Sequence, residues 1–168
     1  MPVITPADAG GANRCAFLDM IAWSEIGAAL LAKSDNGYNV LVGSTPAHPL
    51  LFDSYAAHPN VENKVLDSSA AGRYQLLYRY WLAYKQTLGL PDFSPLSQDK
   101  IALQQIRECR ALPYIDAGDL NRAILLCSRI WASLPGNSYG QHTQTLGDLQ
   151  RAYQSAGGTL AGAEPAAA

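Results

Sequence analysis

The sequence has 168 residues, of which 15% are charged, and a formal net charge of −2 at pH 7. This length is typical of one domain and is enough to bury a substantial hydrophobic core. A charge balance without a basic stripe excludes the usual nucleic-acid-binding surface, which neutralises phosphates with Lys and Arg, so we expect no nucleic-acid partner.

The first predicted helix runs from an N-cap at Asn13 to about Glu25 and includes the stretch FLDMIAWSEIG. Its apolar residues recur at helical spacing and place Glu25 on the side that faces the core. Burial of an unpaired carboxylate and the negative end of the helix dipole both favour the protonated acid, which can donate a proton. The alternative is that the helix frays after Trp23 and leaves Glu25 as a solvated surface residue.

A short β-rich segment follows the first helix. Asn36-Gly37 is a strong type I′ turn signal, and it precedes the β-favouring run Tyr38 to Val42, with which the stretch LLFDSY can pair. From Pro46 to Ala71 the chain is rich in Pro, His, Asn and Ser with little periodicity, which predicts a loop over a small sheet.

The rest of the chain is predicted to be helical. Helical patterns occur in YQLLYRYWLAYKQTLG closing on Gly89, SPLSQDKIALQQIRECRAL opening at Ser94 and Pro95, DLNRAILLCSRIWASL opening at Asp119, and TQTLGDLQRAYQSAGG. One early helix, a small sheet and several later helices predict an α+β fold. Because no repeat or linker divides the sequence, we expect a single domain over residues 1–168, with frayed ends at about 1–12 and 159–168.

The three cysteines, Cys15, Cys109 and Cys127, have no CxxC spacing and no histidine nearby in sequence. They indicate neither a zinc site nor a disulfide framework, and we expect no metal and no cofactor. Cys127 lies in an apolar helical run that is typical of a buried, inert thiol. No stretch reaches the roughly 18 uncharged apolar residues of a membrane span, so we expect a chain that does not insert into a membrane.

Five motifs, taken in order, resemble the phage lambda endolysin family. They are AFLDMIAWSE, AGRYQLL, LGLPDFSPLSQDKIALQQI, ALPYIDAGDL and IWASLPGNSYGQ, and the match covers roughly Asn13 to Gly158. Members of that family are lysozyme-like lytic transglycosylases that act on bacterial peptidoglycan. The resemblance implies a lysozyme-like α+β fold in which the N-terminal helix ends at the catalytic glutamate, while a small sheet and a helical lobe line a glycan groove.

The resemblance also implies roles for particular residues. Glu25 lies where the family has its single catalytic acid/base, and AAGRYQLL and NSYGQ look like groove motifs. The substrate-binding residues implied in this way are Tyr38, Asn39, Gly72, Tyr74, Gln75 and Tyr139. From the residues alone, such side chains are ordinary caps, loop anchors or strand residues, and Tyr74 and Gln75 can simply open the next helix. Arg73 stays outside the catalytic set, because its guanidinium can equally hold a structural carboxylate.

The sequence departs from the family at two places. Many lambda-like relatives have Gly directly after the glutamate, whereas here Ile26 precedes Gly27, and the stretch up to Tyr38 differs in length. This difference affects the expected backbone position just after Glu25. Asn39 stands where the phage lambda endolysin has an acid, so binding differs here if that carboxylate contacts the glycan.

Two reactions fit a catalytic glutamate. Hydrolysis by inversion requires a second carboxylate about 6.5–9.5 Å away to activate water. Asp35 and Thr45 do not reproduce the Glu, Asp and Thr spacing of phage muramidases, but Asp35 and Asp53 remain candidates because spacing within a loop does not fix a distance. A lytic transglycosylase needs one residue, which first donates a proton and then accepts one. The sequence therefore favours transglycosylation, with muramidase hydrolysis as the alternative.

A third hypothesis is a wall-binding module without catalysis, which the presence of Glu25 makes the least favoured. The partner that the resemblance implies is the glycan strand of peptidoglycan, and we expect a monomer that lyses the host cell. The resemblance further implies that the protein stays in the host cytoplasm until a holin encoded elsewhere releases it to the periplasm and cell wall.

Overall fold

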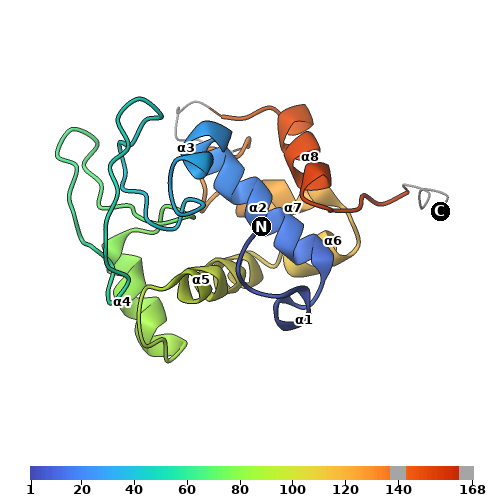
Figure 1. Ribbon diagram of the computed structural model, residues 1–168. Helices are drawn as coiled ribbons and strands as arrows, with labels where there is room; N and C mark the ends of the chain where they lie inside the picture. The colour runs from blue at the N-terminus through green and yellow to red at the C-terminus, as the bar shows by residue number, and fades with distance from the viewer. Residues whose placement is uncertain (137–142, 163–168) are drawn as a thin grey trace. The chain divides into compact units, whose positions relative to one another are not determined.

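The computed structural model describes residues 1–136 and 143–162 (Figure 1). The helices of this part of the chain are α1 (Pro6–Ala9), α2 (Ala12–Ile26), α3 (Ala28–Ala32), α4 (Tyr78–Thr87), α5 (Pro95–Glu108), α6 (Leu112–Asp116), α7 (Leu120–Cys127) and α8 (Leu146–Ser155). The chain forms two compact units. The central unit comprises residues 21–102 with Pro2, and the terminal unit comprises the remaining residues. The expectation of a single catalytic domain stays a prediction.

The N-terminal part of the terminal unit is more regular than expected. Residues 1–12, predicted to be frayed, contain α1, which Thr5 caps by accepting a hydrogen bond from Asp8 N at 3.1 Å. Asn13 is not an N-cap, because it lies inside α2. Its side chain instead accepts from Thr159 N at 2.9 Å and donates to Ile115 O at 3.1 Å. The amide therefore fastens the helix to two other segments of the unit.

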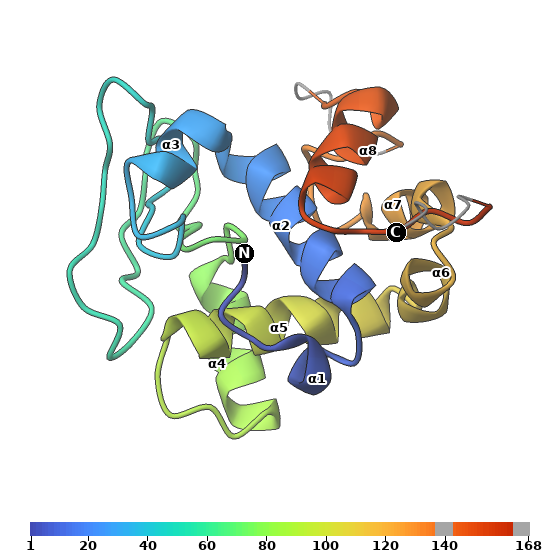
Figure 2. The same cartoon turned by 45° about the vertical axis from the view of Figure 1, so that its right-hand side comes forward.

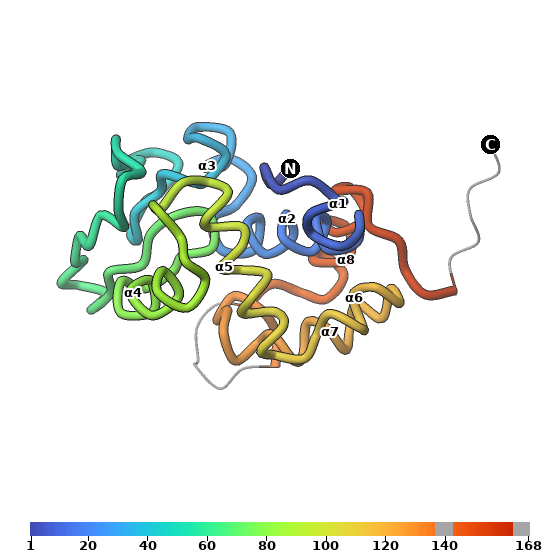
Figure 3. Tube along the Cα trace, turned by 90° about the horizontal axis from the view of Figure 1, so that it is seen from below, coloured from blue at the N-terminus to red at the C-terminus, as the bar shows by residue number. Residues whose placement is uncertain are grey.

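Two of the later helices, α5 and α7, begin where the sequence signals predicted, but both end earlier than expected. Ser94 precedes α5 and accepts a hydrogen bond from Ser97 N at 3.5 Å, and Asp119 caps α7 by accepting one from Arg122 N at 3.2 Å. The predicted helix that opens at Asp119 was expected to continue through Leu134, whereas α7 ends at Cys127. In the terminal unit α6 packs against α7 (Figure 3).

The segment between α3 and α4 belongs to the central unit and consists mainly of loops (Figure 2). Its pairing is limited to isolated antiparallel bridges, among them Val40 with Leu51 and Leu41 with Ala71. Phe52 N donates to the carbonyl of Asn39 at 3.0 Å, so the predicted pairing of the two apolar runs is confirmed. The predicted small sheet is thus reduced to a few bridges, because turns interrupt the runs after a few residues.

A cluster of apolar side chains supports these loops. Its buried members are Phe52, Ala71, Leu76, Trp81, Leu90, Phe93 and Ile101. The rings of Trp81 and Phe93 meet edge to face with centroids 5.1 Å apart. The cluster joins α4, α5 and the loop segment, and so fixes the residues next to Ala71. In the described residues, no helix combines the length and the apolar character needed to cross a membrane.

Candidate active site

Glu25 lies in the last turn of α2, one residue before the helix ends at Ile26. Its side chain is half-buried, whereas Ile21 and Ser24 in the same part of the helix are buried. The helix does not fray after Trp23, so the carboxylate stands at the negative end of the helix dipole. Glu25 is thus neither fully solvated nor fully enclosed, and its catalytic role stays a prediction.

A tight turn follows α3 in the central unit. Asn36 and Gly37 have positive φ angles of 47° and 88°, and Tyr38 N donates to Asp35 O at 2.8 Å. Two consecutive positive φ angles are what a type I′ turn requires. The type I′ turn predicted from Asn36-Gly37 is therefore confirmed.

This turn packs against the residue that follows Glu25. A Cβ built on the buried Gly37 would lie 2.9 Å from Ile26 Cδ1 and 2.8 Å from Leu31 Cδ2, which is closer than side chains tolerate. The same Cβ would lie 3.5 Å from Arg73 Cα. Gly37 therefore lies between the end of α2 and the backbone of Arg73. Ile26, which departs from the family pattern, is the last helical residue and forms one side of this contact.

The motif AAGRYQLL forms a tight hairpin. Ala71 and Leu76 exchange two N–H···O hydrogen bonds of 3.0 Å, and Gln75 N donates to Gly72 O at 3.2 Å. Gln75 has a positive φ of 49°, which a helix cannot contain. The expected helix start at Tyr74 is therefore wrong, and α4 begins at Tyr78.

The side chain of Gln75 folds over this hairpin. Its Nε2 donates to Gly72 O at 2.9 Å, and the amide is half-buried. Gly72 is buried, has a φ of 80° and donates its N–H to Val40 O at 2.8 Å. A Cβ on Gly72 would collide with Gln98 and lie 3.2 Å from Phe93 Cζ. Glycine is thus required here by packing within the protein, and a contact of Gly72 with glycan stays a prediction.

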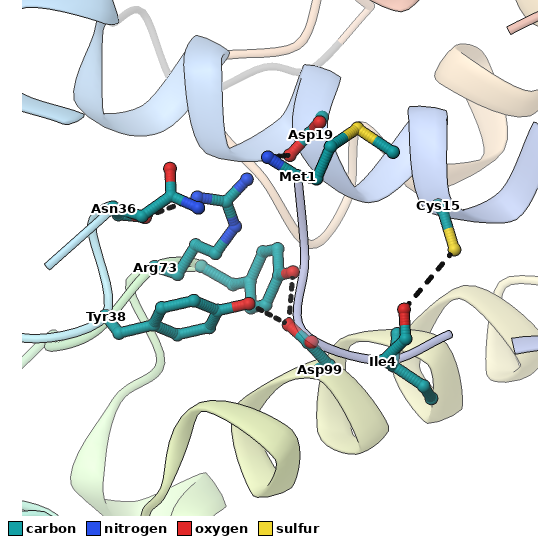
Figure 4. A network of polar contacts seen from close by, with 9 residues as sticks. Met1, Ile4, Cys15, Asp19, Asn36, Tyr38, Arg73 and Asp99 are labelled. Atoms are coloured by element: carbon teal, nitrogen blue, oxygen red, sulfur yellow. Dashed lines mark hydrogen bonds and ion pairs between the residues drawn. The ribbon is translucent and has the colours of Figure 1, made fainter. Parts of the chain in front are cut away.

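Tyr38 and Tyr74 point into the interior of the central unit. Both hydroxyls donate to the same oxygen of Asp99, Tyr38 at 2.8 Å and Tyr74 at 2.6 Å (Figure 4). The two tyrosines are only 1% and 4% exposed, and Asp99 is 0% exposed. Burial first, and then the charge of Asp99, raises the pKa of Tyr74 well above its ordinary value, so its phenol stays protonated and donates. Direct binding of glycan by these two tyrosines stays a prediction.

Arg73 is buried between these tyrosines and the type I′ turn. Its Nη1 donates to Asn36 O (Figure 4). Its guanidinium carbon lies 5.2 Å from the ring centroid of Tyr38 and 5.9 Å from that of Tyr74, which is within cation–π range. These contacts give Arg73 a structural role and support leaving it outside the catalytic set.

The remaining polar candidates lie nearer the surface. Asn39 is half-buried, and its Oδ1 accepts from Asp35 N at 2.9 Å. The exposed carboxylate of Asp35 accepts a hydrogen bond from Tyr55 OH at 2.6 Å. Burial, and then this bond to Asp35, raises the pKa of Tyr55. Asp53, the other candidate for a second carboxylate, is exposed.

Tyr139, the last predicted site residue, lies outside the described residues. Within residues 1–136 and 143–162, no three His, Cys, Asp or Glu side chains gather closely enough to hold a metal ion. The three cysteines are free and buried, so the predicted burial of Cys127 is confirmed.

Gln98 and Asp99 were not among the predicted site residues. Both lie in the first two turns of α5, and both are buried. The signal that marks Asp99 is its spacing, because Ala102 and Ile106 follow at i+3 and i+7 and are buried on the same side of the helix. A carboxylate on an apolar stripe indicates a buried acid, and a buried acid is ordinarily hydrogen-bonded.

Comparisons with known proteins agree on one family. The family model described as Endolysin matches residues 15–160. The endolysin of Escherichia phage lambda is 52% identical, over 88% of this chain and 93% of its own length. The endolysin of Escherichia phage P2 is 45% identical, over 96% of this chain and 100% of its own length.

Solved structures give the same result. Bacteriophage lambda lysozyme complexed with a chitohexasaccharide is similar with a TM-score of 0.80 and 49% identity, over 89% of this chain and 97% of that one. Lysozyme from bacteriophage lambda is similar with a TM-score of 0.76 and 47% identity, again over 89% and 97%. The predicted lysozyme-like α+β fold is thereby confirmed.

Proposed function

This chain belongs to the endolysin family, and we propose that it cleaves the MurNAc–GlcNAc β-1,4 bond of bacterial peptidoglycan with Glu25 as its acid/base. The observation that carries the proposal is the position of this half-buried carboxylate at the end of α2, next to the turn of Gly37. A similar protein is bound to a chitohexasaccharide, which is a chain of amino sugars like a peptidoglycan strand. The outcome of the reaction is lysis of the host cell.

The arrangement favours a lytic transglycosylase over a hydrolase. Hydrolysis with inversion needs a positioned second carboxylate to deprotonate water. Of the two candidates for that role, Asp35 accepts a hydrogen bond from Tyr55 and Asp53 is exposed. Both side chains are exposed, so burial does not hold either of them in one orientation toward a water molecule. A reaction that uses a single carboxylate therefore fits the central unit better.

In this mechanism one residue moves two protons. Glu25 first donates its proton to the oxygen that leaves the muramic acid C1. The 6-hydroxyl of the same muramic acid then attacks C1 and closes a 1,6-anhydro ring, while its proton passes to the Glu25 carboxylate. The enzyme is thereby restored without consuming water. The half-buried amides of Gln75 and Asn39 are suited to hold the glycan during these steps.

We further propose that the enzyme acts in the cell wall after a holin encoded elsewhere releases it from the host cytoplasm.

The test of the reaction is mass analysis of the muropeptides that the purified protein releases from peptidoglycan. We expect muramic acid ends that are one water lighter than hydrolysed ends and that resist borohydride, because an anhydro ring has no reducing end. Asp35→Asn and Asp53→Asn should keep most of the activity, since neither residue serves as a base. Borohydride-reducible ends, together with loss of activity in one aspartate variant, would establish a muramidase instead.

A further inference from the structure

A buried carboxylate on α5 holds two tyrosines that come from different parts of the chain. Asp99 Oδ1 accepts from the hydroxyls of Tyr38 and Tyr74 at 2.8 and 2.6 Å (Figure 4). A carboxylate that is withdrawn from water loses its solvation, and well-placed hydrogen bonds are needed to offset that loss. Asp99 therefore fixes the positions of both phenol groups relative to α5.

The residue before Asp99 makes the same connection through the backbone. Gln98 is 3% exposed, and its Oε1 accepts from Arg73 N at 2.9 Å. Its Nε2 donates to Tyr38 O at 3.0 Å. One side chain thus adds to the backbone pairing of these two segments, in which Gly72 N donates to Val40 O at 2.8 Å. We refer to Gln98 and Asp99 together as the α5 clamp.

The α5 clamp holds the two segments that carry the polar site residues. Tyr38 directly precedes Asn39, and Tyr74 directly precedes Gln75. Both amides are half-buried and so reach the surface of the central unit. On the other side of Tyr38, Gly37 contacts Ile26, the neighbour of Glu25. A shift of either tyrosine would therefore move a polar amide relative to the end of α2.

We propose that Gln98 and Asp99 are positioning residues, which hold Tyr38 and Tyr74 so that Asn39 and Gln75 are placed to bind the glycan beside Glu25. This inference rests on the proposed function. The α5 clamp itself is buried, so it offers almost no surface to a substrate. A buried ionised group adds little net stability compared with apolar residues of the same volume, but a fully bonded polar network imposes one arrangement on its neighbours.

Double-mutant cycles test the inference. Tyr74→Phe removes one hydroxyl bound by Asp99 and keeps the ring, so the fold is retained while Gln75 loses its fixed position. We expect the rate of clearing of outer-membrane-permeabilised cells, per folded protein and well below Tm, to fall roughly tenfold, since larger misplacements cost about a hundredfold. In a Gln75→Ala background, Tyr74→Phe should have little further effect. Tyr38→Phe should behave in the same way with Asn39→Ala.

Tyr153→Phe is the matched control. Tyr153 is a buried tyrosine of the terminal unit, and its hydroxyl donates to Thr159 O at 3.3 Å. The substitution also removes one tyrosine hydroxyl, together with a part-buried hydrogen bond to a neutral carbonyl. It should lower Tm by less than Tyr38→Phe or Tyr74→Phe, whose hydroxyls bind a carboxylate, and leave clearing per folded protein unchanged.

The outcomes separate the two proposals. If Tyr38→Phe and Tyr74→Phe lower only Tm, as Tyr153→Phe does, the tyrosines are structural and the positioning role is overturned while the proposed function stands. The same conclusion follows if Tyr74→Phe costs as much with Gln75→Ala as without it. If the wild-type protein releases no muropeptides, the proposed function fails, and the positioning role fails with it.

Discussion

Glu25 combines two properties of a proton donor, because it is half-buried and stands at the negative end of a helix. Replacing its carboxyl by an amide keeps the shape of the side chain and removes the transferable proton. We therefore expect Glu25→Gln to lower the rate of cell clearing by a factor of about 10² to 10⁴ and to change Tm little. Turbidity clearing of permeabilised cells and a thermal melt measure the two effects.

Glu108→Gln is a suitable control for this substitution. Glu108 is also the last glutamate of a helix, but its side chain is exposed and lies in the terminal unit. Its amide variant should clear cells at the wild-type rate. If Glu25→Gln cleared cells as fast as Glu108→Gln does, Glu25 would not be the catalytic acid/base.

The sequence located Glu25 more easily than Asp99. Both carboxylates follow or precede apolar residues at helical spacing, and both fall in motifs that resemble the family, but the resemblance implies a role only for Glu25. Asp99 lies among Ser97, Gln98 and Lys100, and such a polar stretch is ordinarily solvent-exposed. Its burial depends on Tyr38 and Tyr74, which are 61 and 25 residues away in the chain, and spacing along the sequence does not reveal such partners.

At the scale of elements, the type I′ turn makes the clearest prediction. Gly37→Ala forces a side chain into positive φ and against Ile26 and Leu31. We expect the free energy of unfolding to fall by about 2 kcal/mol or more. Cell clearing per folded protein should fall as well, because the displaced Ile26 adjoins Glu25. Chemical denaturation and turbidity clearing measure the two effects.

Gly89→Ala distinguishes backbone strain at a positive φ angle from steric clash of the new Cβ with neighbouring side chains. Gly89 also has a positive φ, of 61°, but a Cβ there would meet no atom within 4 Å. In Gly89→Ala the free energy of unfolding should fall only by the cost of placing alanine at a positive φ angle. The activity per folded protein should be unchanged. If Gly37→Ala and Gly89→Ala lowered the free energy of unfolding equally, the contact of Gly37 with Ile26 would contribute nothing to stability.

Local signals predicted the type I′ turn and the starts of α5 and α7 but not the start of α2, while tertiary packing decided the hairpin. Asn36-Gly37 specifies its own turn, and Ser94 and Asp119 mark helix starts through their own hydrogen bonds. The hairpin between Ala71 and Leu76 has no such local code. Its residues continue the apolar period of α4, and the chain departs from a helix because the bonds to Val40 and Gln98 require it.

For the whole molecule, the order of helix, loop-rich segment and later helices was predictable from periodicity, and it is enough to define an α+β fold. The short helices α1, α3 and α6 were not predicted, since four or five residues do not display a helical period. The extent of β-pairing was also overestimated from the sequence. The apolar runs near Val40 and Leu51 favour strands, but only the fold shows how few residues pair.

A buried histidine links the stability of the whole molecule to pH. His58 Nε2 lies 2.8 Å from Leu76 O, and its Nδ1 accepts from Asn60 N at 3.1 Å. Its ring packs against Phe93 and Tyr78, with centroids 4.7 and 5.6 Å away. Burial lowers the pKa of His58, although the bond to Leu76 opposes the shift. The folded protein therefore holds this imidazole neutral, with Nε2 donating to the hairpin.

The lowered pKa predicts loss of stability in acid. In the unfolded chain the imidazole binds a proton below about pH 6.5, whereas in the folded chain it does so only at lower pH. The free energy of unfolding should therefore be unaffected by this group near pH 8 and should fall as the pH drops from about 6.5 toward the folded pKa. His58→Gln keeps a donor for Leu76 O and cannot be protonated in this range. Its denaturation curves, compared with those of the wild type at pH 8 and pH 5, should show a smaller loss on acidification. Equal losses in both proteins would mean that His58 is protonated as readily in the folded chain as in the unfolded one.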